Sequence, residues 1–171
     1  TSLLGRITVS DITLQLAAEL LVDMSRSESV DEFLETAMPK VCAATNAADA
    51  AIFQPDEGNW RQVFPRAPIQ GLDLTLLGDA IDENQTVARD AWGVCPLQRR
   101  SESGETLAIR FTNGTADPGL VDAVAALIGV GVQAVRSRQL DKRRVRRLEA
   151  ILDIAGQWNQ TLEMETLLQR M

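Results

Sequence analysis

Cysteine side chains are the first candidates for chemistry in this sequence. Cys42 and Cys95 are the two cysteines of the 171-residue chain, and they do not form a CxxC motif or a metal-ligand spacing. The chain contains no histidine. This excludes Ser-His-Asp and Cys-His catalysis, phosphoryl relay through histidine, His-ligated haem and most zinc sites. Two buried, reduced thiols are the simpler interpretation, and the sequence carries no metal signature.

Charged side chains offer two further candidates. Asp79, Asp82 and Glu83 are close enough in sequence to act as an acid and a base. Because they fall around the end of a short predicted helix, surface charge is the simpler interpretation. Arg66 could hold a carboxylate or phosphate through its guanidinium group, or it could be a solvated loop residue. There is no Gly-rich phosphate loop. We therefore predict no catalytic residues.

The element that must position any site is a long helix predicted over 117–158. Asp117 suits an N-cap and Pro118 suits the first helical position. Apolar residues with helical spacing follow at Val121, Val124, Leu127, Ile128, Val132 and Val135. Two glycines in this stretch, Gly129 and Gly131, predict close packing of the helix against a neighbour.

The end of the chain resembles its beginning. Displacing the sequence by 134 positions places Ile154 over Leu20, and the apolar phase of 154–171 then follows that of 20–37. This predicts a tandem array in which a second copy is cut off. The expected organisation is a linker (1–9), one domain (10–140), a linker helix (141–160) and the start of a second copy (161–171). We expect the chain to be a piece of a longer protein.

The remaining pattern predicts an α+β domain with a central antiparallel β-sheet. The N-terminal helices and the long C-terminal helix are expected to pack on one face of the sheet. Ser29 and Glu32 form a capping box for the second helix, and Pro39 should bend that helix. The expected elements are helices at 11–24, from 29 onward and at 72–81, and strands at 48–54, 60–64, 86–89, 94–100 and 105–111.

Charge is unevenly distributed. The net charge is −7, and the segment 136–147 carries +6, which leaves −13 for the rest. An acidic protein is a poor binder of nucleic acid, although the basic segment alone could contact DNA. A solvated helix face is the simpler interpretation, so we expect no nucleic-acid partner. No apolar run approaches the roughly 20 residues that span a bilayer, and we expect a cytoplasmic protein without a membrane contact.

Several segments resemble the GAF domain, a relative of the PAS sensory fold, in their order and phrasing: Val30–Leu34, Leu74–Asn84, Val94–Leu97, Thr106–Ile109 and Leu162–Leu168. The resemblance implies a bacterial-style sensory module whose sheet holds a small ligand and whose terminal helices dimerise. The Asn-Lys-Phe-Asp-Glu signature of cyclic-nucleotide-binding members cannot be assembled here. Bilin-binding members need a placed cysteine and usually a histidine, so no bilin is expected and any ligand stays unidentified.

An apolar pocket with a few polar groups is typical of small-ligand sites. The candidate lining is Phe53, Phe64, Arg66, Leu77, Trp92, Cys95, Leu97 and Ile109. The alternative is that these side chains fill the core or an empty remnant of a pocket.

A seam along the helices predicts a homodimer. Its residues are Leu16, Leu20, Val124, Ile128, Val135, Leu148, Ile151, Ala155 and Trp158, and the last four have the spacing of a two-helix coiled coil. The expected function is therefore a non-catalytic regulatory domain that signals to a downstream domain of the same chain. A ligand-free spacer and a thiol-dependent methionine sulfoxide reductase-like enzyme are the alternatives.

Overall fold

The computed structural model describes residues 9–98 and 104–169. The elements are α1 (Val9–Arg26), α2 (Val30–Thr45), β1 (Ala47–Asp56), β2 (Asn59–Phe64), α3 (Thr75–Glu83), β3 (Val87–Arg89), β4 (Trp92–Pro96), β5 (Thr106–Phe111) and α4 (Pro118–Gln169). By its internal contacts the chain divides into Thr1–Val135 and Arg136–Met171, which are described separately. The predicted N-terminal linker lies mostly outside the described residues, although Val9 already belongs to α1.

A five-stranded antiparallel sheet forms the centre of Thr1–Val135. Its strand order is β2-β1-β5-β4-β3, and every neighbouring pair is antiparallel. The predicted hairpin of β1 and β2 is confirmed, with Asp56 opposite Asn59 at its turn. The edge strand β3 is short and pairs with β4 only as far as Val94. The α+β class and the antiparallel sheet are therefore confirmed.

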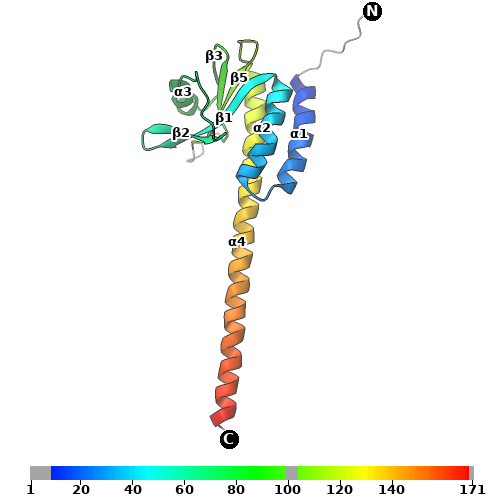
Figure 1. Cartoon of the computed structure of the whole chain (residues 1–171), viewed down its shortest axis with the longest axis vertical. Coiled ribbons are helices and arrows are strands. Elements are labelled where there is room, and N and C mark those ends of the chain that lie inside the picture. Colours follow the sequence, from blue (N-terminus) through cyan, green and yellow to red (C-terminus); the bar gives the residue numbers. More distant parts are fainter. Residues whose placement is uncertain (1–8, 99–103, 170–171) are drawn as a thin grey trace, which may run out of the picture. The chain divides into compact units, whose positions relative to one another are not determined.

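One face of the sheet is covered by α1, α2 and the first part of α4. Strand residues such as Ile52, Leu107 and Ile109 are buried there against Phe33 of α2 and Ile128 of α4. Figure 1 shows α1 and α2 on this side and α3 on the opposite side of the strands. The N-terminal helices and α4 thus share one face, as the sequence predicted.

The other face of the sheet is closed by α3. Leu76, Leu77 and Ala80 of α3 are at most 1% exposed and pack against strand residues that include Phe53 and Trp92. Successive side chains of a strand point to opposite faces of the sheet. Trp92 and Val94 therefore pack on the face covered by α3, whereas Cys95 and Leu97 pack on the face covered by α1, α2 and α4, called here the helical side.

The two glycines of α4 allow the close packing that the sequence predicted. A Cβ atom on Gly129 would lie 2.2 Å from the backbone oxygen of Leu97 in the segment after β4. A Cβ atom on Gly131 would lie 2.3 Å from the ring of Phe33 in α2. Since contacts this short do not occur, α4 can approach both neighbours only because these positions carry no side chain.

Local signals fix the start and end of α2. Ser29 is the N-cap, and its hydroxyl accepts the backbone N–H of Glu32 at 3.2 Å. The Glu32 carboxylate accepts the backbone N–H of Glu28 at 2.7 Å, one residue before the expected partner. Pro39 lies inside the helix, and Asn46 ends it in the left-handed conformation.

The residues of α4 differ sharply in exposure along the helix. Val121, Val124 and Ile128 are at most 1% exposed, whereas every residue over 140–158 is exposed. By length and hydropathy alone, the stretch Pro118–Trp158 is apolar enough to cross a membrane, contrary to our expectation, and half of its apolar window is buried inside the protein. The buried residues of this stretch pack in the core of the domain, as expected for a core helix.

Candidate functional site

The structure does not bring the predicted pocket residues together. Phe53, Leu77 and Trp92 are buried on the α3 side of the sheet. Cys95, Leu97 and Ile109 are buried on the helical side, and Phe64 is partly buried against the same cluster. Arg66 is exposed. Seven of the eight side chains thus belong to the core, but they lie on opposite faces of the sheet and do not line one pocket.

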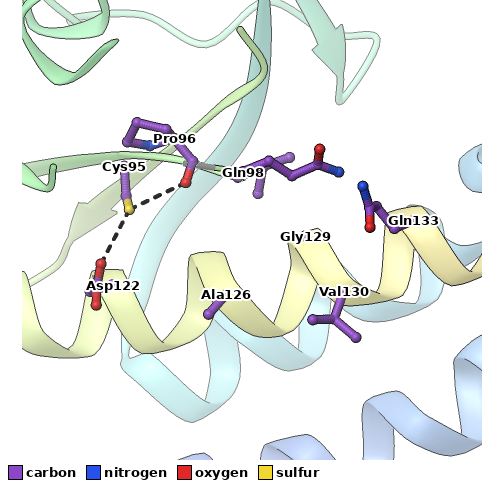
Figure 2. A pocket seen from close by; sticks show the side chains of 9 residues that line it. Cys95, Pro96, Gln98, Asp122, Ala126, Gly129, Val130 and Gln133 are labelled. Carbon is purple, nitrogen blue, oxygen red and sulfur yellow. Dashed lines mark hydrogen bonds between the residues drawn. The ribbon is translucent and has the colours of Figure 1, made fainter. Parts of the chain in front are cut away.

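A cavity of about 430 Å³ lies between the end of β4 and α4, and it is open to solvent because Ala126, Val130 and Gln133 of its lining are exposed. It is lined by Cys95, Pro96, Leu97, Gln98, Asp122, Ala126, Gly129, Val130 and Gln133, and Figure 2 shows how these residues lie. Two of them, Cys95 and Leu97, belong to the predicted pocket. The volume falls within the range of roughly 300–1,000 Å³ that is usual for ligand pockets.

The cavity forms where the sheet edge is left open. Because β3 begins at Val87, opposite Val94, no described strand covers the outer edge of β4 at Cys95 and Pro96. Pro96 has no backbone N–H and suits such an edge position. On the other wall, Gly129 lies so close to the Leu97 backbone that a Cβ atom on the glycine would collide with it.

A small polar network fixes the inner end of the cavity. The Thr86 hydroxyl donates to Asp122 Oδ1 at 3.2 Å. The Cys95 thiol lies 3.6 Å from the same oxygen and 3.5 Å from the backbone oxygen of Pro96 (Figure 2). Asp122 of α4 is thus joined to the residue before β3 and to β4.

The described residues at the outer part of the cavity are uncharged. Gln98 and Gln133 extend their side-chain amides toward one another from opposite walls, and Ala126 and Val130 are apolar (Figure 2). Asp122 is the only charged residue among the described lining. The described side chains of the lining can accept and donate hydrogen bonds.

The environment of the thiols does not suit nucleophilic chemistry. Reactive cysteines lie beside cations or at helix N-termini. Cys95 is 1% exposed and has a carboxylate and a carbonyl oxygen as neighbours. Burial, and to a lesser extent Asp49, raises the pKa of the Cys42 thiol above its ordinary value. Both cysteines are free thiols.

The predicted carboxylate group is dispersed over the surface. Arg89 forms ion pairs with Asp73 at 3.0 Å and with Asp79 at 3.6 Å, while Asp82 and Glu83 are exposed. Hydrogen bonds from Thr75, together with Arg89, lower the pKa of Asp73 below its ordinary value. Within the described part of the chain, no group of three His, Cys, Asp or Glu residues could hold a metal ion.

The predicted dimer seam must be corrected for its first five members. Leu16, Leu20, Val124, Ile128 and Val135 are at most 2% exposed within a single chain, because they pack in its own core. A second copy therefore cannot contact these side chains in this structure. A helix face buried in the core of its own chain has the same apolar periodicity as a face buried in a dimer interface.

The remaining seam members are accessible. Leu148, Ile151 and Trp158 are 60%, 52% and 71% exposed, and Ala155 is exposed as well. Sequence reasoning missed a second apolar surface, on α1, where Leu14 and Leu21 are 72% and 60% exposed. Their spacing of seven residues was the available signal.

Comparison with known proteins identifies the fold through structure alone. No protein-family model and no curated protein sequence matches the chain. The chain is similar to the GAF domain of an Acinetobacter phosphoenolpyruvate-protein phosphotransferase, with 13% identity and a TM-score of 0.58 over 77% of this chain and 97% of that one. The corresponding domain from Coxiella burnetii gives 12% identity and a TM-score of 0.55 over 74% and 95%.

A third solved structure extends the likeness to a sensor kinase. The GAF domain of the potassium sensor histidine kinase KdpD from Escherichia coli gives 13% identity and a TM-score of 0.53, and the match covers 81% of this chain and 99% of that one. The matches thus span nearly the full length of each GAF domain. Over most of its length, the chain has the fold of a GAF domain.

Proposed function

We propose that this chain is a non-catalytic regulatory GAF domain of a multidomain signalling protein, and that it acts by pairing with a second copy through α4. The observation that carries the proposal is the change of environment along this one helix. The first part of α4 is a core element, whereas Leu148, Ile151 and Trp158 are exposed on the later part. Solvent-exposed apolar residues at this density are typical of an interaction surface.

A second copy is the partner that fits the seam best. Leu148, Ile151, Ala155 and Trp158 follow spacings of three, four and three residues, as in the core of a two-helix coiled coil. A single helix without tertiary packing is only marginally stable in water. Pairing would bury the seam and stabilise the helix at the same time.

The basic segment before the seam sets the salt dependence of such a pair. Residues 136–147 carry +6, and in a parallel dimer the two segments would lie side by side. Like charges at this distance repel, and salt screens them over a Debye length of about 10 Å at 0.1 M. Association of a parallel pair should therefore become stronger as the salt concentration rises.

The surroundings of the polar residues support a non-catalytic role. A methionine sulfoxide reductase-like activity needs a reactive thiol. Among the described residues, Cys95 lies beside a carboxylate and a carbonyl oxygen, and burial raises the pKa of the Cys42 thiol, which disfavours its thiolate. A ligand-free spacer remains the alternative within the same mode of action, since it would pair through the same helix. The cavity beside α4 favours the regulatory form.

Sedimentation equilibrium tests the pairing. We expect the wild-type chain to form a dimer at about 100 μM, a concentration at which a micromolar dissociation constant gives nearly complete pairing. Ile151→Asp places a charge on the seam and should yield a monomer. Ala150→Asp adds the same charge outside the seam and should leave the dimer intact. A monomeric wild type, or an Ile151→Asp variant that still pairs, would contradict the proposal.

A further inference from the structure

We infer that Asp141 and Arg144 determine how a second copy docks on α4, and that the resulting pair is parallel and in register. The inference rests on the pairing proposed above and deepens it by naming the residues that set its orientation. The surface concerned lies entirely within Arg136–Met171. Its partner is a second copy of this chain.

The seam continues one heptad toward the N-terminus of α4 with two charged residues. Asp141 lies seven residues before Leu148, and Arg144 lies seven residues before Ile151. Positions seven residues apart return to the same face of a paired helix. All four side chains are exposed in a single copy. A partner that covers the seam over this further heptad therefore meets a layer formed by Asp141 and Arg144.

The two charges of this layer compensate each other. Arg144 Nη1 lies 3.9 Å from Asp141 Oδ1, and the side chains are 80% and 66% exposed. At this exposure the ion pair adds little to the stability of a single copy. In a parallel, in-register pair, two carboxylates and two guanidinium groups would meet in adjacent layers of the interface. Each carboxylate could then accept hydrogen bonds from the guanidinium group of the other copy, and the layer as a whole is neutral.

Other arrangements leave the Asp141 carboxylate without such a partner. In an antiparallel pair, contact of Leu148 with Ile151 of the second copy fixes one register. That register places Asp141 against the side chain of Trp158. A parallel pair displaced by one heptad places Asp141 against Leu148 instead. In both arrangements the carboxylate loses water and gains no cation from the second copy, which is costly.

A different antiparallel register would join the two charged residues directly. Asp141 would then face Arg144 of the second copy. In this register Leu148 faces Ser137, and the apolar seam no longer contacts itself. Burial of the seam, which is the driving force for pairing, is therefore lost. Of these arrangements, the parallel, in-register pair alone satisfies the charged and the apolar residues together.

Disulfide formation reports the orientation of the pair. Ser137 is exposed and lies seven residues before Arg144, so in a parallel, in-register pair it faces Ser137 of the second copy. We expect Ser137→Cys chains to form a disulfide-linked dimer in a glutathione redox buffer, because facing seam positions come close enough for this bond. Ala150→Cys lies outside the seam and should not link. The wild type, which has only Cys42 and Cys95, gives the background.

Charge variants identify the residues responsible, with sedimentation equilibrium as the measurement. Arg144→Asp places four carboxylates in the layer and should raise the dissociation constant of the dimer about tenfold or more. Asp141→Arg combined with Arg144→Asp exchanges the two charges and restores a neutral layer, so it should return the dissociation constant to within about threefold of the wild type. Arg143→Asp makes the same change of net charge outside the seam and should not weaken pairing.

The outcomes separate this inference from the proposed pairing. A monomeric wild type would overturn both. If the wild type forms a dimer but Ser137→Cys links no more than Ala150→Cys, the orientation is wrong and the pairing stands. Equal weakening by Arg144→Asp and Arg143→Asp, or no recovery in the charge-exchanged variant, would likewise overturn the role of the charged layer alone.

Discussion

Gly131 of α4 faces the ring of Phe33 of α2 so closely that a Cβ atom on the glycine would lie 2.3 Å from Cζ. Phe33 is fully buried, and protein cores are close-packed, so displacing its ring would disturb its neighbours. The contact joins α4 to α2 within the core. It also supplies a sensitive test of the packing.

Gly131→Ala should lower the free energy of unfolding by about 1 kcal/mol. Overpacking a core costs about 1–3 kcal/mol, whereas replacing a helical Gly by Ala gains up to about 1 kcal/mol in propensity. Gly156→Ala is the matched control in the same helix, because no atom lies within 4 Å of the place that its new methyl group would take, and it should be neutral or stabilising. Urea unfolding followed by circular dichroism compares the two, and a stable Gly131→Ala variant would contradict the close contact.

Adjacent leucines of α1 should respond very differently to truncation. Leu20 is 1% exposed, and Leu20→Ala should cost about 2–5 kcal/mol because it leaves a core cavity. Leu21 is 60% exposed, so Leu21→Ala should change the free energy of unfolding by less than about 0.5 kcal/mol. Urea unfolding at low protein concentration measures both. A costly Leu21→Ala variant would mean that another surface covers this face.

Cys42 should make stability pH-dependent on the alkaline side. Burial, then Asp49, raises the pKa of its thiol above the ordinary value of 9.0. The neutral thiol is therefore favoured in the folded state, so this contribution is fully present below pH 9 and is lost as the pH rises through the folded pKa. The chain has no tyrosine to titrate in the same range. Cys42→Ala should alter the dependence of the free energy of unfolding on pH between about pH 8 and pH 10, and an unchanged dependence would refute the assignment.

Arg110 links two strands on the α3 side of the sheet. Its guanidinium group forms an ion pair with Asp49 and lies 5.7 Å from the centre of the Trp92 ring. Because both charged side chains are about one-third or more exposed, a double-mutant cycle of Arg110→Ala and Asp49→Ala should give a coupling of about 0.5–1 kcal/mol that falls with salt. The pair of Arg61 and Asp56, at 3.9 Å and more exposed, is the control and should couple less. Equal coupling in the two pairs would contradict the role of partial burial.

Local chemistry made most of the elements predictable. The Ser29 capping box located α2, and the turn after Asp56 located the first hairpin. These signals act between residues close in sequence, so they are visible without a structure. The domain boundaries proposed at residues 140 and 160 and the second copy stay predictions. α4 runs through both positions as one helix, so the secondary structure marks no boundary at either.

The pairing of faces was less predictable. Trp92 and Cys95 are three residues apart on one strand, so alternation already places them on opposite faces, and the predicted pocket combined them. Val124 and Ile128 show the same limit in a helix. Their periodicity reveals an apolar face, but the partner of that face depends on tertiary packing.

The cavity had almost no local signal in the sequence. Its lining joins the end of β4 to α4, and Gln98 and Gln133 are brought together only by the approach of two elements distant in sequence. Pro96 was the one residue that hinted at an open edge, because proline avoids the middle of a sheet. A cavity of this kind depends on how a strand and a helix are placed relative to each other, and residue types alone do not predict that placement.

The uneven surroundings of α4 have a consequence for its backbone amide protons. Over 118–135 the helix is held by the buried core, so exchange with deuterium there should require opening of much of the domain. Over 140–158 every side chain of a single copy is exposed, and the helical hydrogen bonds should open locally and exchange quickly. One continuous helix would then combine a slow half with a fast half, and the protection of the fast half would report directly on whatever holds it.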